Sequence, residues 1–169
     1  MKQASRHLLE AAQLAEIIRQ AEHGYPNEVC GAVIGRRGEP AGYEVRPLPN
    51  IAGETALFGP DGKPRSARTA YLVDPLAECR LLREIDDDGR EIVLLYHSHP
   101  DADAGFSALD RVMALAPDGE PWWPGVSYLV ISVHKGRARS AAYFSWDPAS
   151  KEFVPQPLPL SPLDSSSPN

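Results

Sequence analysis

Two histidines separated by one residue form the segment of this sequence best suited to chemistry. His97 and His99 lie in a Tyr-His-Ser-His-Pro segment at the end of a predicted apolar strand. Because side chains alternate along a strand, both imidazoles point to the same side of the sheet. Asp110 lies one turn into the next predicted helix, where its carboxylate can provide a third ligand. Two imidazoles and a carboxylate form a ligand set for Zn²⁺ that leaves a fourth position open.

A zinc site with an open position is the setting of a metallohydrolase. Water at that position would have its pKa lowered to about 7. The reaction also needs a base that takes a proton from the water and returns it to the leaving group. Glu28 is the candidate base, because it directly precedes a short apolar strand and can approach the metal from there.

Ser107 has two interpretations, and the sequence leaves both open. It stands three residues before Asp110, in the S-x-x-D pattern that caps the start of a helix. If it lies near the metal, its hydroxyl can instead stabilise the oxyanion of an attacked amide. One residue can serve both purposes.

The elements that position these residues do not alternate regularly between helix and strand. Hydrophobic periodicity and turn residues predict helices over 5–22, from Asp74-Pro75 to Asp86–Gly89, and from Ser107 to Leu115. Strands are predicted over 29–35, 43–48, 68–73, 91–96, 126–133 and 138–146, with mostly loop over 49–67. This order predicts an α/β or α+β fold with a largely antiparallel sheet and helices packed on it.

The composition is that of one globular domain followed by a tail. Hydrophobic residues make up 43% and charged residues 24% of the 169 residues, which is the balance of a soluble domain. We predict that domain over residues 1–154. Residues 155–169 are rich in proline and serine, so a disordered tail is predicted there.

Charge and hydropathy exclude several classes of function. The net charge of −6 argues against nucleic acid or an anionic membrane as a partner. The N-terminus has no continuous apolar segment, and no stretch approaches the roughly 18 apolar residues that span a bilayer. We therefore expect a cytoplasmic protein. The two cysteines, Cys30 and Cys79, exclude a disulfide scaffold and a cysteine-based zinc site. Cys30 could be considered as a nucleophile, but the role of a small buried residue in a strand fits it better.

The motifs together resemble the JAMM (MPN+) zinc metalloprotease family in its compact prokaryotic form. The signature is His97-x-His99-Pro, six residues, then Ser107-x-x-Asp110, with an upstream segment in which Glu28 precedes a Cys-Gly strand. The resemblance covers roughly residues 5–150. It implies the MPN/JAB (cytidine-deaminase-like) fold, a curved mixed sheet flanked by helices. It also implies Zn²⁺ as cofactor, the two histidines and Asp110 as its ligands, Glu28 as general acid/base and Ser107 as the oxyanion-stabilising residue.

The same resemblance implies a class of substrate. Family members cleave peptide or isopeptide bonds after the C-terminal Gly-Gly of ubiquitin or ubiquitin-like proteins, and compact members resemble bacterial enzymes that process sulfur carriers. Residues 116–125 leave little room for the long substrate-gripping insertion of the eukaryotic enzymes. We therefore expect a ubiquitin-like or sulfur-carrier protein as partner, and the sequence indicates no oligomeric state.

Other functions remain open at this point. Within the same family, a phage-tail or cell-wall peptidase is the main alternative. A non-catalytic MPN interaction scaffold is another, although inactive members typically lose a ligand and this chain keeps all of them. Non-haem Fe(II) oxygenases also use two histidines and a carboxylate, but usually with the carboxylate beside the first histidine. Trp122-Trp123 either form a small satellite core or line a groove for an extended substrate.

Overall fold

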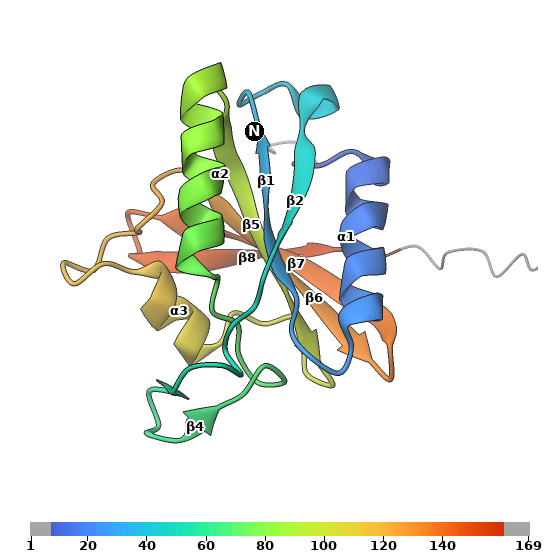
Figure 1. Ribbon diagram of the computed structural model, residues 1–169, viewed down its shortest axis with the longest axis vertical. Coiled ribbons are helices and arrows are strands. Elements are labelled where there is room, and N and C mark those ends of the chain that lie inside the picture. The colour runs from blue at the N-terminus through green and yellow to red at the C-terminus, as the bar shows by residue number, and fades with distance from the viewer. Residues whose placement is uncertain (1–7, 161–169) are drawn as a thin grey trace, which may run out of the picture.

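A six-stranded sheet organises residues 8–160, the part of the chain that this computed structural model describes (Figure 1). Its strand order is β2-β1-β5-β6-β7-β8. The bounds are β1 Cys30–Gly35, β2 Glu44–Leu48, β5 Glu91–Pro100, β6 Ser127–His134, β7 Arg137–Asp147 and β8 Glu152–Leu158. The central strands β5 and β6 run parallel, and the other neighbouring pairs run antiparallel. The predicted fold class, a mixed and largely antiparallel sheet with helices, is therefore confirmed.

Helices cover both faces of this sheet. They are α1 (Ala11–Gly24), α2 (Pro75–Asp88) and α3 (Ala108–Ala114), with one 3-10 turn at Pro40–Gly42. The apolar face of α1 packs against Val33 of β1 and Leu129 of β6. The opposite face of the sheet packs against α2 and α3, with Ala32 in contact with the α2 side and Tyr128 with the α3 side. Within residues 8–160, no helix is both long and apolar enough to cross a membrane.

A bulge in β5 decides which face its side chains meet. Leu94 pairs with Val33 and Ile92 with Ile34, so Val93 is an extra residue without a partner on β1. The extra residue shifts the alternation by one position. Ile92 and Leu95 consequently both lie in the cluster on the α2 face. Positions 97 and 99, two and four residues after Leu95, therefore face the same side of the sheet.

The ends of α2 agree with the sequence prediction. The side chain of Asp74 accepts a hydrogen bond from the backbone N–H of Leu76 at 3.0 Å, and Pro75 is the first helical residue. Gly89 ends the helix with φ of 70°, a left-handed conformation that favours glycine. These are short-range signals, which explains why they could be predicted.

The first helix begins later than predicted. It starts at Ala11 rather than at residue 5, and Gln13 accepts a hydrogen bond from the backbone N–H of Glu10 at 2.8 Å, which satisfies a free donor at this end. Residues 1–7 lie outside the described part of the chain. The predicted end of the helix near Gly24 is confirmed.

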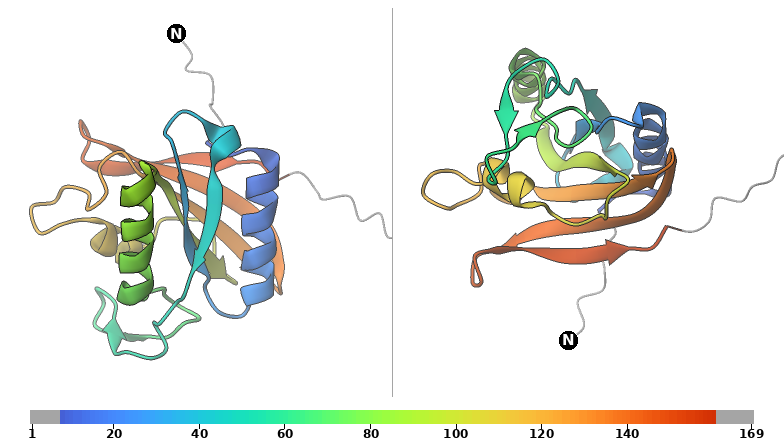
Figure 2. Two further views of the ribbon diagram at one scale, coloured as in Figure 1. Left: turned by 45° about the horizontal axis from the view of Figure 1, so that its top comes forward. Right: turned by 90° about the horizontal axis from the view of Figure 1, so that it is seen from below.

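The strand predicted over 68–73 is wrong. Only an isolated bridge between Asn50 and Val73 forms there. The side chain of Asn50 bonds the backbone of residues 70 and 72 and takes the place of a strand ladder. The preceding segment is mostly loop, as predicted, with a short hairpin of β3 (Leu57–Phe58) and β4 (Pro64–Arg65). This hairpin and α3 lie at the same end of the molecule (Figure 2).

The tail does not begin where it was predicted. Residues 155–158 belong to β8, which pairs with β7 at the edge of the sheet. Pro155 and Pro157 have the same parity along this strand, so both nitrogens face the same side. An edge strand tolerates proline where the missing N–H would have pointed to solvent. Residues 161–169 of the predicted tail lie outside the described residues.

Candidate metal centre

Three side chains from β5 and α3 converge at the C-terminal end of β5. Nε2 of His97 lies 3.1 Å from Nε2 of His99, and Oδ2 of Asp110 lies 3.3 Å from each of these nitrogens. All three residues are buried. In a tetrahedral zinc site with metal–ligand distances of about 2.0–2.1 Å, neighbouring ligand atoms are about 3.3 Å apart. The triangle formed by these three atoms therefore has the dimensions of one face of such a site.

The two histidines lie on β5, a strand in the middle of the sheet. His97 lies opposite Cys30 on β1 and Val130 on β6, so its strand is paired on both sides. His99 is two residues further on, and the strand ends at Pro100, four residues beyond the predicted range of 91–96. Because these positions share one face, the two imidazoles meet on the side of the sheet that α3 covers.

The N-terminus of α3 aims the carboxylate. The backbone N–H of Ser107 donates to Oδ2 of Asp110 at 2.8 Å, and the N–H of Asp110 donates to Oγ of Ser107 at 3.0 Å. These reciprocal bonds form a capping box, so the cap interpretation of Ser107 is confirmed. The same bonds hold the Asp110 carboxylate in one orientation, which faces the histidines.

The two histidines are oriented by different kinds of contact. Nδ1 of His99 lies 2.8 Å from the backbone oxygen of Asp103. Since a carbonyl oxygen can only accept, Nδ1 carries the proton and Nε2 presents a free electron pair. Nδ1 of His97 is buried and has no hydrogen-bond partner among the described residues. Its ring instead stacks on Tyr71, with 4.4 Å between ring centroids and 28° between ring planes.

Glu28 is buried beside this group, although it precedes β1. Its backbone N–H donates to the oxygen of Ala67 at 2.7 Å, and its backbone oxygen accepts from Asn50 at 3.0 Å. Its side chain is only 6% exposed, and Oε2 has no partner within residues 8–160. A buried carboxylate oxygen without a partner is costly, which fits a position that faces a bound ion or water.

Burial and neighbouring charges together shift the pKa values of these groups. It raises the pKa of Glu28 to about 8; the nearby His99 opposes this rise and the negative charge of Asp110 adds to it. Burial also lowers the pKa of His97. Burial acts in the same direction on His99, but the hydrogen bond and charge of Asp110, together with the charge of Glu28 and the carbonyl of Asp103, outweigh it and raise that pKa. Burial opposes ionisation of Asp110, yet the two imidazoles hold its pKa well below its usual range.

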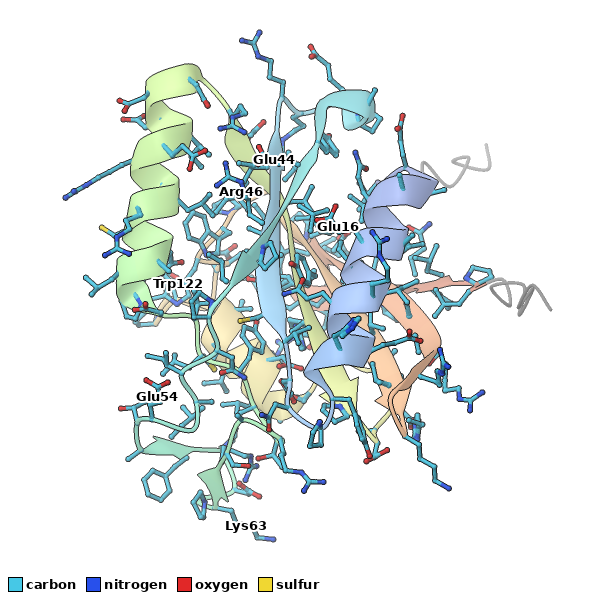
Figure 3. The ribbon with its side chains drawn as sticks, turned by 45° about the vertical axis from the view of Figure 1, so that its right-hand side comes forward. Glu16, Glu44, Arg46, Glu54, Lys63 and Trp122 are labelled. Carbon is cyan, nitrogen blue, oxygen red and sulfur yellow. The ribbon has the colours of Figure 1, made fainter. Side chains whose placement is uncertain are left out.

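An apolar cavity of about 530 Å³ adjoins the site. Tyr71, which stacks on His97, is part of its wall, and Leu95 and Tyr128 belong to the sheet face beneath it. Trp122 and Trp123 also line the cavity. Trp123 packs in the α2 cluster, whereas Trp122 is 58% exposed and lies near the lower end of α2 (Figure 3). Trp123 therefore fits the packing interpretation, while the groove for an extended substrate stays a prediction for Trp122.

Sequence reasoning missed Tyr71 and Asn50. Neither belongs to a recognisable motif, and Tyr71 was assigned to a strand that does not form. A Pro-Asn pair after a strand signals a turn, but nothing in the sequence says which backbone groups the amide binds. Cys30, in contrast, fits its structural interpretation, because burial raises the pKa of its thiol to about 12 and keeps it protonated.

Comparison with known protein families places this chain. Residues 10–147 match the family of prokaryotic homologs of the JAB domain, and the chain belongs to this family. The predicted resemblance is thereby confirmed.

Individual relatives narrow the comparison. The chain is 32% identical over 133 residues to a desampylase of Haloferax volcanii, covering 76% of this chain and 82% of that protein. It is 36% identical over 95 residues to a probable TtuB-protein conjugate cleaving protease of Thermus thermophilus, covering 56% of this chain and about half (51%) of that protein. A solution structure of a protein from Desulfitobacterium hafniense shares the fold, with a TM-score of 0.59, 22% identity and coverage of 88% of each chain.

Proposed function

We propose that this protein is a zinc-dependent hydrolase. Its substrate is a peptide or isopeptide bond after the C-terminal Gly-Gly of a ubiquitin-like or sulfur-carrier protein. The observation that carries the proposal is the triangle of ligand atoms, 3.1–3.3 Å apart, in a buried site. The same site holds Glu28, whose Oε2 has no hydrogen-bond partner within residues 8–160. The relatives support the reaction class, since one is named a desampylase and the other a conjugate-cleaving protease.

His97, His99 and Asp110 would hold the metal. Two neutral imidazoles and one carboxylate leave a zinc ion with net positive charge and one open position. When bound, zinc supplies Lewis acidity, which lowers the pKa of water and polarises a carbonyl oxygen. The unpartnered Oε2 of Glu28 fits this arrangement, because a buried carboxylate needs a positive or hydrogen-bonding neighbour.

Glu28 would transfer the proton. In the metal-free protein burial raises its pKa to about 8, and the positive charge of a bound metal would lower it toward neutral pH. A group with such a pKa can accept a proton from water and return it to the leaving amine without a large energetic cost in either direction. Its fixed backbone keeps the carboxylate within the site through both steps.

Ser107 would assist with its hydroxyl proton. A hydroxyl has one donor and two acceptor positions. In the capping box Oγ acts as acceptor toward the N–H of Asp110, so the O–H remains able to donate to a developing oxyanion. The cap and the catalytic role are therefore compatible in one residue.

The preference for Gly-Gly follows from the need for close approach. Glycine has no side chain, so its backbone can reach a buried metal site that bulkier residues cannot enter. The folded body of the carrier would supply most of the affinity, because ordering a flexible tail costs entropy. Residues beside the cavity, such as Tyr71 and Trp122, offer apolar surface for the part of the tail that precedes the glycines.

A cleavage assay tests the proposal. Fusions of a ubiquitin-like carrier, Gly-Gly and a short extension are incubated with the zinc-loaded protein and analysed by mass spectrometry. We expect cleavage after the second glycine. Glu28→Gln should retain zinc and lose at least about 10²-fold in turnover, because only proton transfer is removed.

Other outcomes distinguish the alternatives. Intact carrier fusions together with cleaved cell-wall peptides would overturn the substrate and favour the peptidase alternative. A protein that binds no zinc and cleaves neither would be an interaction scaffold.

A further inference from the structure

The side chain of Asn50 forms four hydrogen bonds within the site. Its Nδ2 donates to the backbone oxygens of Glu28 at 3.0 Å and Ala70 at 3.1 Å. Its Oδ1 accepts from the backbone N–H groups of Ala52 and Leu72, both at 3.0 Å. A primary amide has two donors and two acceptor positions, so the hydrogen-bonding capacity of Asn50 is fully used.

These bonds join two parts of the site that are remote in sequence. One is the backbone of Glu28, which carries the carboxylate. The other is the pair of residues on either side of Tyr71, whose ring stacks on His97. A single amide therefore links the placement of Glu28 to the placement of the ring that packs against His97.

The region around Tyr71 depends on this link because it belongs to no strand. One isolated bridge connects Asn50 with Val73. Beside it, the N–H of Ile51 donates to the oxygen of Leu72 at 2.8 Å and the N–H of Asp74 donates to the oxygen of Pro49 at 3.1 Å. The backbone groups of Ala70 and Leu72 that face inward would otherwise need other partners. The amide of Asn50 supplies them.

His97 in turn depends on Tyr71. A metal-binding histidine is normally oriented by a hydrogen bond from its second ring nitrogen. His99 has such a bond, to the oxygen of Asp103, but the buried Nδ1 of His97 has no partner among the described residues. Stacking on Tyr71 at 4.4 Å is then the nearest of the ring contacts that orient His97, beside its tilted contacts with His99 and Phe106.

We propose that Asn50 is a positioning residue, which fixes Glu28 and, through Tyr71, His97 relative to one another. The inference deepens the proposed function and rests on it. Asn50 touches no reacting atom in this scheme, and its effect is geometric. A displacement of about 1 Å in a catalytic group can cost about 10²-fold in rate.

Two substitutions separate geometry from charge. Asn50→Asp keeps the size of the side chain and its acceptor oxygen. It replaces the Nδ2 donor, which bonds the two backbone oxygens, with a second acceptor oxygen. Asn50→Leu has a similar shape, removes all four bonds and adds no charge. We expect both variants to lower kcat by about 10–10²-fold with KM changed less than about twofold. An effect of Asn50→Asp alone would arise from its charge and would overturn the proposal.

Zinc affinity provides a readout that needs no substrate. Competition with a chromophoric chelator should show a loss of about tenfold in Asn50→Leu and in Tyr71→Leu, within the range found when supporting contacts of metal ligands are removed. Tyr71→Phe keeps the stacked ring and should keep the affinity. If one Asn50 variant fails to fold, the other still tests the role of Asn50, and the Tyr71 pair tests the step from Tyr71 to His97.

Gln13 offers a matched control. Its Nε2 also donates to two backbone oxygens, those of Pro40 at 2.7 Å and Tyr43 at 3.0 Å, and its Oε1 is also an acceptor. Gln13→Glu should lower the thermal midpoint comparably with Asn50→Asp, yet leave kcat and zinc affinity unchanged.

Unchanged kcat and zinc affinity in folded Asn50 variants would overturn this proposal and leave the proposed function intact. A wild-type chain that binds no zinc would overturn both.

Discussion

The surroundings of Glu28 change the pKa of its carboxyl group. It is buried, its Oε2 is unpartnered among the described residues, and burial raises its pKa from 4.5 to about 8. The same burial that suits it for proton transfer makes its ionised form costly in the metal-free protein. This cost is measurable because it depends on pH.

We predict that Glu28→Gln changes the pH dependence of stability in the metal-free protein. Between pH 4.5 and about 8 the folded state holds a proton that the unfolded state has lost, so the free energy of unfolding of the wild type falls as pH rises. The glutamine variant lacks this contribution. Its stability relative to the wild type should therefore grow across this window, by an amount on the order of a few kcal/mol, and stay constant above it.

Urea unfolding with excess chelator, repeated from pH 4 to 9, measures this difference. A difference between the two proteins that does not vary with pH would contradict the raised pKa.

Among the elements of the fold, α3 and β8 are short, and each is stabilised by a particular contact. The capping box of Ser107 and Asp110 both starts α3 and orients a candidate ligand. The strand β8 adds an edge to the sheet and buries Phe153 and Leu158, each 8% exposed. Removing either contact should produce a specific deficit.

Ser107→Ala should have two separable effects. Loss of the cap should lower the free energy of unfolding by about 1 kcal/mol, and loss of the hydroxyl donor should lower kcat by about 10²-fold. Ser107→Thr keeps the cap and the hydroxyl, whereas Ser107→Asp keeps the cap without a donor. Steady-state kinetics and denaturant unfolding of the three variants assign each effect, and a fully active Ser107→Asp would show that the residue only caps the helix.

Truncation should show whether β8 belongs to the folded domain. A chain that ends after residue 154 loses Leu158, which packs in the α1-face cluster, while a chain that ends after residue 160 keeps it. Burial of one leucine side chain contributes about 1.5–3 kcal/mol. We expect the shorter chain to be less stable by at least this amount in thermal unfolding. Equal stability of the two chains would place the end of the domain at residue 154 after all.

In the folded molecule, the candidate metal ligands lie on elements that contacts elsewhere in the fold hold in place. The histidines lie on a strand paired on both sides, and Asp110 lies on a capped helix. The metal is therefore expected to bind a folded domain rather than to fold it.

Removal of zinc should abolish cleavage without unfolding the protein. Circular dichroism with excess chelator should retain the helical and strand signals, and the activity should return on addition of one equivalent of Zn²⁺ per chain. Loss of the dichroism signal together with the metal would show that the site has a structural rather than a catalytic role.

Features that depend on neighbours along the chain could be predicted from the sequence alone. Strand alternation places His97 and His99 on one face, and a three-residue spacing joins Ser107 to Asp110 in a cap. The start and end of α2 follow from Asp74-Pro75 and Gly89 in the same way. The motifs also predicted the family, because their order and spacing are those of a known signature.

Features that depend on contacts between distant segments emerge only in the folded molecule. It brings Glu28 beside the ligands, and it uses one amide, that of Asn50, to hold residues 70 and 72 where the sequence suggested a strand. It also makes an edge strand of residues 152–158, whose prolines suggested a disordered tail. The physical reason is the same in each case. A buried hydrogen bond or an exposed strand edge is satisfied by whatever group the fold brings near, and local composition does not reveal that group.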